Sequence, residues 1–374
     1  MAMKYRADHV GSLLRPPEVL EAHAALREGR MTAEQVREVE DRAVLAAIQL
    51  QREVGLDVLS DGEMRRPGWS SDFARSVEGY VPGAPALRLV WHGAAGEQPP
   101  VPPAGAGGQV IGGRLKQKRR LTEDQVGFLK QHAGGMPFKM TMPAASYVTT
   151  RGYKPGVSEP AYSGRKEVLE DVTRIIHAEV KALAAEGVPY IQLDNPHYPD
   201  YIDAGRVEQM KAYGWDIPRL IQDDVEADNA CLRGFDRGNV TLAMHFCRGN
   251  GGRGGWHTTG GYDAIAEQVF TQLDVDAFLL EYDSERAGTF EPLRFIPKGK
   301  TVVLGLITTK SGELESEDEI VRRIEEASKY VAIEDLALSP QCGFASVAIG
   351  NPVTPDEQRR KLELVVKVAR RVWG

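Results

Sequence analysis

Short apolar segments alternate with amphipathic helical patterns along most of the chain, and this alternation limits the folds open to it more than any other feature. About eight segments have the length and composition of strands, at residues 6–12, 56–60, 138–142, 190–193, 240–244, 277–280, 301–306 and 333–339. Helical patterns separate many of them, most clearly at 32–54, 165–186, 262–273 and 317–332. Strands that alternate with helices are typical of parallel sheets. Eight such units predict an α/β fold, the (β/α)8 TIM barrel, with a doubly wound open sheet as the alternative.

Two helices carry clear start signals. Thr32 is followed three residues later by Gln35, and the last helix opens with Thr354-Pro355-Asp356-Glu357. An N-cap threonine with Gln or Glu three residues on satisfies two backbone N–H groups of the first turn, and proline suits the first helical position. These signals predict where both helices begin.

The chain is expected to form one domain with an insertion. Its 374 residues are 42% hydrophobic, enough for one large core, and we interpret residues 1–374 as a single catalytic barrel. The stretch 81–120 is rich in Pro and Gly and interrupts the alternation after the second strand. Within it, 87–91 and 109–111 are expected to pair as a hairpin. The basic run 113–120 predicts a solvated face, or else a site for an anionic substrate tail.

Composition excludes several classes of protein. The formal net charge of −7 argues against nucleic acid as a partner, and no apolar run is long enough to span a membrane or act as a signal core. Three cysteines at wide spacing do not suggest a disulfide framework, so we expect a cytoplasmic protein. Cys231 lies in a helical pattern and is expected to be a buried apolar filler. Nothing in the sequence predicts the oligomeric state.

Residues of the types that bind metals follow several of the apolar segments. His245 and Cys247 stand two apart where 240–244 runs into a glycine-rich loop, so they share one face of a strand. Glu281 and Cys342 also follow apolar segments. Because the carboxyl ends of barrel strands meet at one face, and zinc prefers thiolate, imidazole and carboxylate, these four form a candidate zinc site. The alternative is a core cysteine, a polar loop histidine and an ordinary acid.

Six separated stretches then suggest a family. In chain order they are His9-Val10-Gly11-Ser12, Asp61-Gly62-Glu63, Ile191-Gln192-Leu193-Asp194, Met244-His245-Phe246-Cys247-Arg248-Gly249-Asn250, Leu280-Glu281-Tyr282 and Ser339-Pro340-Gln341-Cys342-Gly343. With these motifs in this order the chain resembles, over nearly its whole length, the C-terminal catalytic barrel of cobalamin-independent methionine synthase. The similarity is greatest to the short single-barrel bacterial relatives of that family.

The resemblance implies a zinc-dependent methyltransferase of methionine biosynthesis. Its zinc ligands would be His245, Cys247, Glu281 and Cys342. Coordination would deprotonate the thiol of homocysteine, or of a related thiol, for attack on a methyl donor such as 5-methyltetrahydrofolate. In this family the carboxylate ligand can give way as the thiol enters, a role that would fall to Glu281.

The resemblance also implies substrate contacts. Glu63 and Asp194 would bind the ammonium group of the amino acid, and Ser12 would bind its carboxylate. The alternative is that Asp61 or Glu63 only caps the segment that follows, and that Asp194 bonds only to backbone.

The chain departs from the long synthases at the methyl-donor side. Lys310 stands where those enzymes carry a histidine thought to relay protons, so it is either a general acid or a group that binds an anion. Tyr147 stands near the expected place of a tryptophan that would stack on a folate ring. The N-terminal barrel of the long enzymes is absent. These departures leave the methyl donor open.

Two further residues are candidates beside the pocket. His197 follows Asp194 closely and is a candidate proton carrier, with a structural or solvent-facing role as the alternative. We expect the glycine-rich loop after Cys247 to be mobile and to bring Arg248 or Arg253 to a substrate carboxylate. Two other interpretations of function remain. One is a zinc-dependent epoxide:thiol alkyltransferase, and the other is a non-catalytic relative that binds zinc or a thiol.

Overall fold

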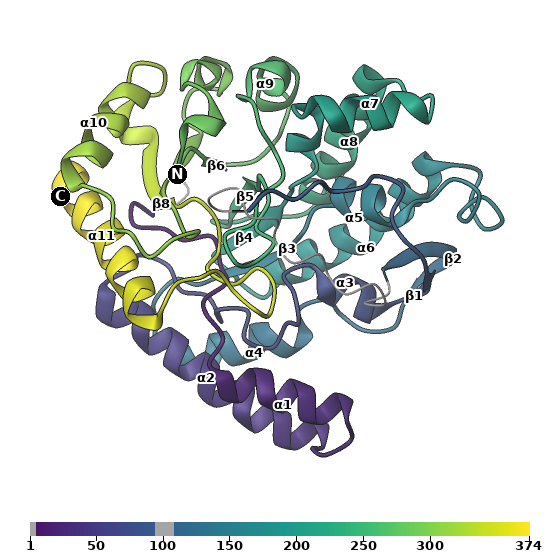
Figure 1. Cartoon of the computed structure of the whole chain (residues 1–374), viewed down its shortest axis with the longest axis horizontal. Coiled ribbons are helices and arrows are strands. Elements are labelled where there is room, and N and C mark those ends of the chain that lie inside the picture. The colour runs from purple at the N-terminus through teal and green to yellow at the C-terminus, as the bar shows by residue number, and fades with distance from the viewer. Residues whose placement is uncertain (1–4, 94–107) are drawn as a thin grey trace.

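The protein is described by a computed structural model that covers residues 5–93 and 108–374. Within these residues six parallel strands form one sheet, in which neighbours follow one another along the chain (Figure 1). They are β3 (Lys139–Pro143), β4 (Tyr190–Asp194), β5 (Thr241–Phe246), β6 (Ala277–Glu281), β7 (Thr301–Ile307) and β8 (Leu336–Pro340). Consecutive parallel strands joined by helical crossovers are the arrangement expected of βα units.

Two irregular segments from the first part of the chain close this sheet into a barrel. Ala7 bridges Leu338 of β8, and Leu59 bridges Phe138 beside β3, both in the parallel sense. The segments also join each other, because the Asp57 N–H donates to the Ala7 carbonyl at 3.0 Å. The ring is therefore complete, and the predicted (β/α)8 barrel is confirmed.

The structure differs from the sequence prediction at the edges of three expected strands. Segments 6–12 and 56–60 occupy the first two positions of the ring but are held by isolated bridges, not by a continuous ladder. The Asp57 carboxylate accepts the backbone N–H groups of Arg6 and Ala7 at 2.8 and 2.9 Å, so a side chain replaces a strand partner there. Residues 333–335 form a 3₁₀ helix, and β8 begins only at Leu336.

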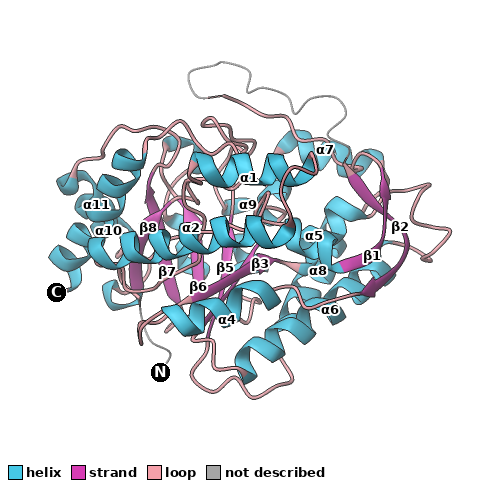
Figure 2. Cartoon of the chain, turned by 90° about the horizontal axis from the view of Figure 1, so that it is seen from below, coloured by secondary structure: helices cyan, strands magenta, loops and turns pink. Residues whose placement is uncertain are grey.

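Helices surround the barrel (Figures 1 and 2). They are α1 (Pro17–Arg27), α2 (Ala33–Val54), α3 (Ser71–Ser76), α4 (Glu123–His132), α5 (Ala145–Gly152), α6 (Arg165–Ala185), α7 (Ala204–Ala212), α8 (Ile217–Leu232), α9 (Asp263–Phe270), α10 (Glu317–Ala327) and α11 (Pro355–Trp373), with 3₁₀ helices η2 (Tyr198–Tyr201), η3 (Glu285–Ala287), η4 (Glu291–Phe295) and η5 (Ile333–Asp335). The capping boxes predicted at Thr32 and Thr354 are both formed.

The strands bury two apolar layers and one ion pair. The larger apolar cluster fills the space between strands and helices, and a smaller one that includes Val58 and Leu279 forms separately from it. The Lys139 ammonium is fully buried and lies 2.6 Å from the Asp8 carboxylate. It also donates to the Gln192 side-chain oxygen at 3.0 Å, so a buried polar network connects the first closing segment to β3 and β4.

The insertion contains a hairpin, but not the predicted one. β1 (Val77–Pro82) pairs antiparallel with β2 (Gln109–Gln117), and β2 packs beside α5 and α6 at one side of the barrel (Figure 2). The expected partner 87–91 forms no strand, so that pairing is wrong, although 109–111 does belong to a hairpin strand. β1 contains a glycine and a register shift, which hide its alternation from the sequence. The proline-rich part at 94–107 lies outside the described residues.

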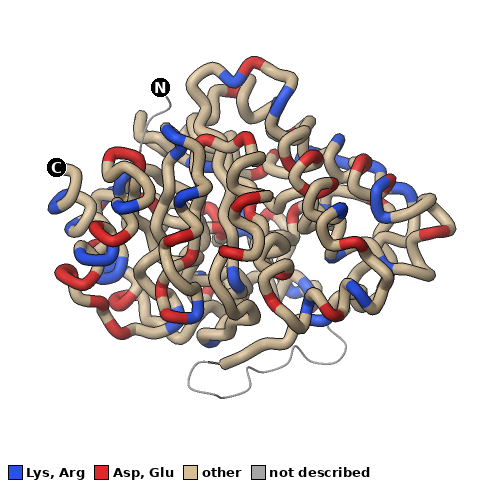
Figure 3. The backbone as a smooth tube through the Cα atoms, turned by 90° about the horizontal axis from the view of Figure 1, so that it is seen from above, with Lys and Arg blue, Asp and Glu red and all other residues tan. Residues whose placement is uncertain are grey.

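Charges are spread over the outer layer. Lys and Arg are interspersed with Asp and Glu along the chain (Figure 3). The basic run of the insertion is engaged in ion pairs, since Arg119 pairs with Asp124 at 2.8 Å and Arg120 with the buried Glu179 at 2.9 Å. Among the described helices none combines the length and the hydropathy that a membrane crossing requires.

Candidate metal centre and active site

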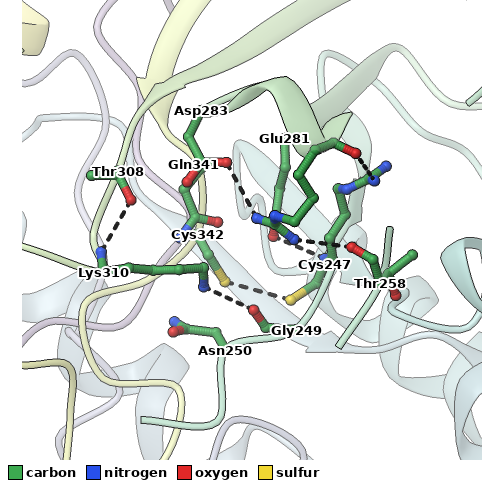
Figure 4. A network of polar contacts seen from close by, with 12 residues as sticks. Cys247, Gly249, Asn250, Thr258, Glu281, Asp283, Thr308, Lys310, Gln341 and Cys342 are labelled. Carbon is green, nitrogen blue, oxygen red and sulfur yellow. Dashed lines mark hydrogen bonds and ion pairs between the residues drawn. The ribbon is translucent and has the colours of Figure 1, made fainter. Parts of the chain in front are cut away.

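Three strand ends bring the four predicted ligands together. His245 lies in β5 and Cys247 directly follows that strand, Glu281 is the last residue of β6, and Cys342 follows β8. Their candidate ligand atoms all lie within 4.8 Å of one another. The two sulfur atoms are 3.6 Å apart and face each other in Figure 4, and His245 Nε2 is 3.8 Å from Glu281 Oε1. Ligands of a tetrahedral zinc ion stand about 3.3–3.8 Å apart, so these two separations match those of zinc ligands.

Unpaired buried atoms provide an independent test of this fit. Both ring nitrogens of His245 and the Glu281 Oε2 atom are buried and have no hydrogen-bond partner among the described residues. An unpaired buried polar group is costly, and most such groups find partners. A cation between the two sulfur atoms, the imidazole and the carboxylate would satisfy these atoms. The donor set therefore fits zinc in chemistry as well as in spacing.

The protonation states of the metal-free cluster point to the same conclusion. Burial raises the pKa of Glu281 to about 7, and Cys342 adds to that rise. Burial lowers the pKa of His245, but nearby Cys342, Asp194 and Glu281 outweigh it and raise that pKa to about 9. The contact with Cys247, together with His245, holds the pKa of the Cys342 thiol well below its usual range. Negative charge in the cluster is thus balanced by protons, whose place a divalent cation can take.

The loop after β5 supports the cluster through its backbone. The Arg248 N–H donates to Glu281 Oε1 at 3.0 Å and so orients that carboxylate. The Arg248 guanidinium is fully buried and donates to the carbonyls of Gly260 and Arg286. The structure therefore does not bring this side chain to the ligand cavity, where the sequence placed it, and Arg253 donates its backbone N–H to the Gly350 carbonyl.

Lys310 lies beside the cluster. Its ammonium donates to the Gly249 carbonyl at 2.9 Å and to the Gly255 carbonyl at 3.5 Å, and Figure 4 shows it next to Cys342. Its positive charge lowers the pKa of both Cys342 and Glu281. The lysine thus fastens the glycine-rich loop and adds a cation near the sulfur atoms.

The predicted substrate contacts line one small cavity at the cluster. Ser12, Glu63 and Asp194 surround it together with His245, Cys247 and Cys342, and Trp69 and Ser346 complete its wall. Its free volume is about 20 Å³, close to the space one water molecule needs. An amino acid is larger than this space, so the cavity must widen to admit one.

Two of these residues are buried carboxylates, and Arg66 Nη1 lies 3.5 Å from Oε1 of one of them, Glu63. Burial raises the pKa of Asp194 to about 7, and Gln192 donates to its Oδ1 at 2.8 Å. Glu63 has a left-handed backbone with φ of 57°, accepts from Thr141 at 3.1 Å, and leaves Oε2 without a described partner. A strained backbone and an unpaired carboxylate oxygen are features that cluster at binding sites. Two carboxylates that face one cavity suit a substrate ammonium.

His197 lies outside that cavity. Its Nδ1 is 3.1 Å from Asp200 Oδ2, and its Nε2 is 2.9 Å from the Tyr201 hydroxyl and 3.1 Å from Asp224. Burial lowers the pKa of His197, but these carboxylates outweigh it and raise the pKa. Both ring nitrogens are thus bonded to other side chains, and neither faces the small cavity.

A second cavity of about 250 Å³ adjoins the cluster, and most of its wall was not predicted. Tyr147 lines it, with its ring 4.7 Å from that of Trp69. The residues that sequence reasoning missed there are Trp69, Trp91, Arg151, Asp200 and His257. The tryptophan at 69 follows the Asp61-Gly62-Glu63 motif closely, and Asp200 follows Asp194 closely, so proximity to motifs was an available signal for both. Trp91 belongs to the insertion and carried no such signal.

A barrel with a thiolate, imidazole and carboxylate cluster at the carboxyl ends of its strands has its reactive groups where barrel enzymes carry their active sites. The fold and the cluster therefore define a TIM-barrel protein with candidate catalytic groups at the carboxyl ends of its strands. The family described as "Cobalamin-independent synthase, Catalytic domain" matches residues 7–371. The chain belongs to the cobalamin-independent methionine synthase family, whose members are methyl transferases acting on small molecules.

Individual relatives agree with this assignment. The uncharacterized protein YxjG of Bacillus subtilis is 37% identical over 372 residues, which are 99% of this chain and 95% of that protein. A crystal structure from Listeria monocytogenes assigned as a vitamin-B12-independent methionine synthase superposes with a TM-score of 0.76 at 29% identity, covering 100% of this chain and 99% of the other. A B12-independent methionine synthase from Shewanella, solved with selenomethionine, shares the fold with a TM-score of 0.71 at 19% identity and 97% and 96% coverage.

Proposed function

We propose that this protein transfers a methyl group to the sulfur of homocysteine or a related thiol, with zinc held by His245, Cys247, Glu281 and Cys342. The observation that carries the proposal is the cluster itself, whose ligand atoms all lie within 4.8 Å of one another. It is supported by the buried imidazole and carboxylate atoms that have no described partner. When bound, zinc supplies the acidity that converts a substrate thiol into a nucleophilic thiolate at neutral pH.

The chain's own residues would bind and orient the thiol amino acid. Asp194 and Glu63 lie in one wall beside the ligands, where their carboxylates would pair with the substrate ammonium. Ser12 lies in the same wall and would donate its hydroxyl to the substrate carboxylate. The Shewanella relative was solved with selenomethionine, a selenium analogue of methionine, which supports an amino acid of this kind as the ligand.

The family relationship suggests 5-methyltetrahydrofolate as a methyl donor to test first. Lys310 is the group best placed to protonate a leaving atom, because its ammonium lies beside Cys342 and Glu281. His197 has less support for this role, since Asp200 and Tyr201 engage both of its nitrogens. We propose that His197 holds the Asp200 side chain in its position in the wall of the second cavity.

Metal content and thiol alkylation test the proposal together. We expect the purified protein to hold stoichiometric zinc by elemental analysis and to methylate homocysteine only while zinc is present. Cys342→Ser should lose most of the zinc and the activity, whereas Cys231→Ser should keep both, because Cys231 is buried in α8 near the Thr173 carbonyl. Equal zinc in both variants would refute the ligand assignment. Turnover of an epoxide, with no methyl transfer from any tested compound, would favour an alkyltransferase instead.

A further inference from the structure

The 250 Å³ cavity beside the metal ligands has a wall that the proposed function does not explain. It shares Trp69, Cys247 and Ser346 with the smaller substrate cavity, so a molecule in it lies next to the substrate sulfur. Its volume falls below the range of about 300–1,000 Å³ that is typical of sites for larger ligands. The position suits a methyl donor, and the size suits a small one.

Aromatic rings form two sides of this cavity. Trp69 and Tyr147 pack together with ring centroids 4.7 Å apart. Trp91 meets His257 edge to face at 5.0 Å, and burial lowers the pKa of His257 to about 3, so that ring is neutral. Indole and phenol faces attract cations, and methylated onium ions are the ligands that such aromatic enclosures bind.

Unpaired polar atoms lie in the same wall. Asp200 is 4% exposed, and its Oδ1 has no hydrogen-bond partner among the described residues. Arg206 Nε lies 3.9 Å from this oxygen, and His197 Nδ1 lies 3.1 Å from the other carboxylate oxygen. Asn250 also leaves its side-chain oxygen unpaired. These two acceptors call for a ligand with N–H groups. Arg151, which also lines the cavity, supplies the opposite charge, and one of its guanidinium nitrogens donates to the Leu87 carbonyl at 3.0 Å.

We propose that this cavity binds the methyl donor and that the donor is a sulfonium α-amino acid, of which S-methylmethionine is the simplest example. The aromatic faces would hold the sulfonium beside Cys247, Asp200 would bind the α-ammonium, and Arg151 would bind the α-carboxylate. The proposal rests on the proposed function, because it supplies the electrophile for the same substrate thiolate.

The reaction is balanced without a further reactant. The thiolate sulfur forms a bond to the methyl carbon, and the bond from that carbon to the sulfonium sulfur breaks. The bonding electron pair stays on the departing sulfur, which leaves as a neutral thioether. No proton and no oxidant is consumed, so the absence of a proton-relay histidine at Lys310 is no obstacle.

The insertion contributes part of the cavity wall. Leu89 and Trp91 come from it and form part of the wall. This part is fastened to the glycine-rich loop, because His92 and Trp256 exchange two backbone hydrogen bonds of 2.7 and 2.9 Å and stack their rings 4.5 Å apart. The cavity, at about 250 Å³, is closer in size to a sulfonium amino acid than to a folate with its long tail.

Competing methyl donors test the inference. Zinc-loaded protein is incubated with homocysteine and one methyl donor at a time. The donors are S-methylmethionine with deuterated methyl groups, trimethylsulfonium, 5-methyltetrahydrofolate and methyl iodide. Mass spectrometry identifies the products. We expect kcat/KM for S-methylmethionine to exceed that for trimethylsulfonium by about tenfold or more, because only the former offers charges to Asp200 and Arg151.

Methyl iodide separates the two levels of the proposal, because it needs no donor site. Zinc-dependent methylation by methyl iodide without turnover of S-methylmethionine would overturn the inference and leave the proposed function standing. Methylation by methyl iodide that does not depend on zinc would overturn the proposed function itself. Equal kcat/KM for S-methylmethionine and trimethylsulfonium would also overturn the inference.

Charge variants test the assigned contacts. Asp200→Asn and Arg151→Met should each lower kcat/KM for S-methylmethionine by about tenfold or more, and far more than they lower the rate with methyl iodide. The matched controls Asp236→Asn and Arg174→Met change exposed residues outside this cavity and should retain the S-methylmethionine rate. The contacts would be refuted if Asp200→Asn and Arg151→Met each lowered the rates with S-methylmethionine and with methyl iodide by the same factor.

Discussion

Replacing Gly305 by alanine is expected to disturb the metal site through the barrel wall. Gly305 lies in β7 between the strands that carry two of the candidate ligands. A Cβ atom there would stand 2.7 Å from Gln341 Cα and 3.0 Å from the Leu280 carbonyl oxygen, whereas ordinary contacts begin at 3.4 Å. Gln341 directly precedes Cys342, and Leu280 directly precedes Glu281. The neighbouring backbone must therefore yield by about 0.7 Å at Gln341, directly after β8, and by less in β6.

This movement sets the expected magnitudes. Overpacking of this kind costs about 1–3 kcal/mol of stability. Zinc sites keep ligand distances within about 0.2 Å, so a shift several times larger should lower zinc affinity by about tenfold or more. Urea unfolding of the metal-free protein and competition with a chromophoric chelator measure the two effects. Gly127→Ala is the control, because nothing lies within 4 Å of its added methyl in α4. Unchanged zinc affinity in Gly305→Ala would refute the reasoning.

Three further changes test other parts of the site. Asp194→Asn should weaken homocysteine about tenfold or more in methyl iodide assays but spare 3-mercaptopropionate, which has no ammonium; equal losses for both thiols would contradict the ammonium contact. Burial lowers the pKa of His9 to about 3, against about 6.5 when unfolded, so below pH 6.5 the unfolded chain binds a proton that the folded chain does not. Stability should therefore fall as the pH drops from 6.5 toward 3, by at most about 1.4 kcal/mol per pH unit from this group. The urea midpoint of His9→Gln should fall less steeply with pH than that of the parent protein. Parallel curves for the two proteins would count against this role of His9. Lys310→Met removes the bonds to the loop carbonyls and should speed hydrogen exchange across residues 249–257, and protection equal to that of the parent protein would rule out this anchoring role.

The barrel and its cluster of candidate metal ligands could be predicted because both follow from local rules. The alternation of apolar and helical segments specifies βα units, and the two-residue spacing of His245 and Cys247 places both on one strand face. Strand ends then meet by topology, which brings Glu281 and Cys342 to the same place. None of these steps requires knowledge of how side chains pack.

The parts that were missed depend on packing across the fold. The hairpin partner of 109–111 is β1, whose glycine and register shift weaken the alternating pattern that marks a strand. Arg248 was expected to reach the substrate, but its backbone serves the cluster while its side chain fastens the loop. The second cavity draws on residues as distant as Trp91 and His257, which meet only because the insertion pairs with the loop after β5.

The barrel is closed unevenly, so two parts of it differ in how easily they open. We call the continuous sheet β3–β8 the frame, and the segments 6–12 and 56–63 the jaw. All four candidate ligands come from β5, β6 and β8, strands within one continuous hydrogen-bonded ladder. Ser12 instead ends the first of the two segments that isolated bridges hold in the ring, and Glu63 follows the second. Such segments open locally at lower free energy than a continuous ladder does. If the protein acts on thiols as proposed, substitutions in the jaw alone should change which thiol it accepts, while the spacing of the four candidate ligands stays constant.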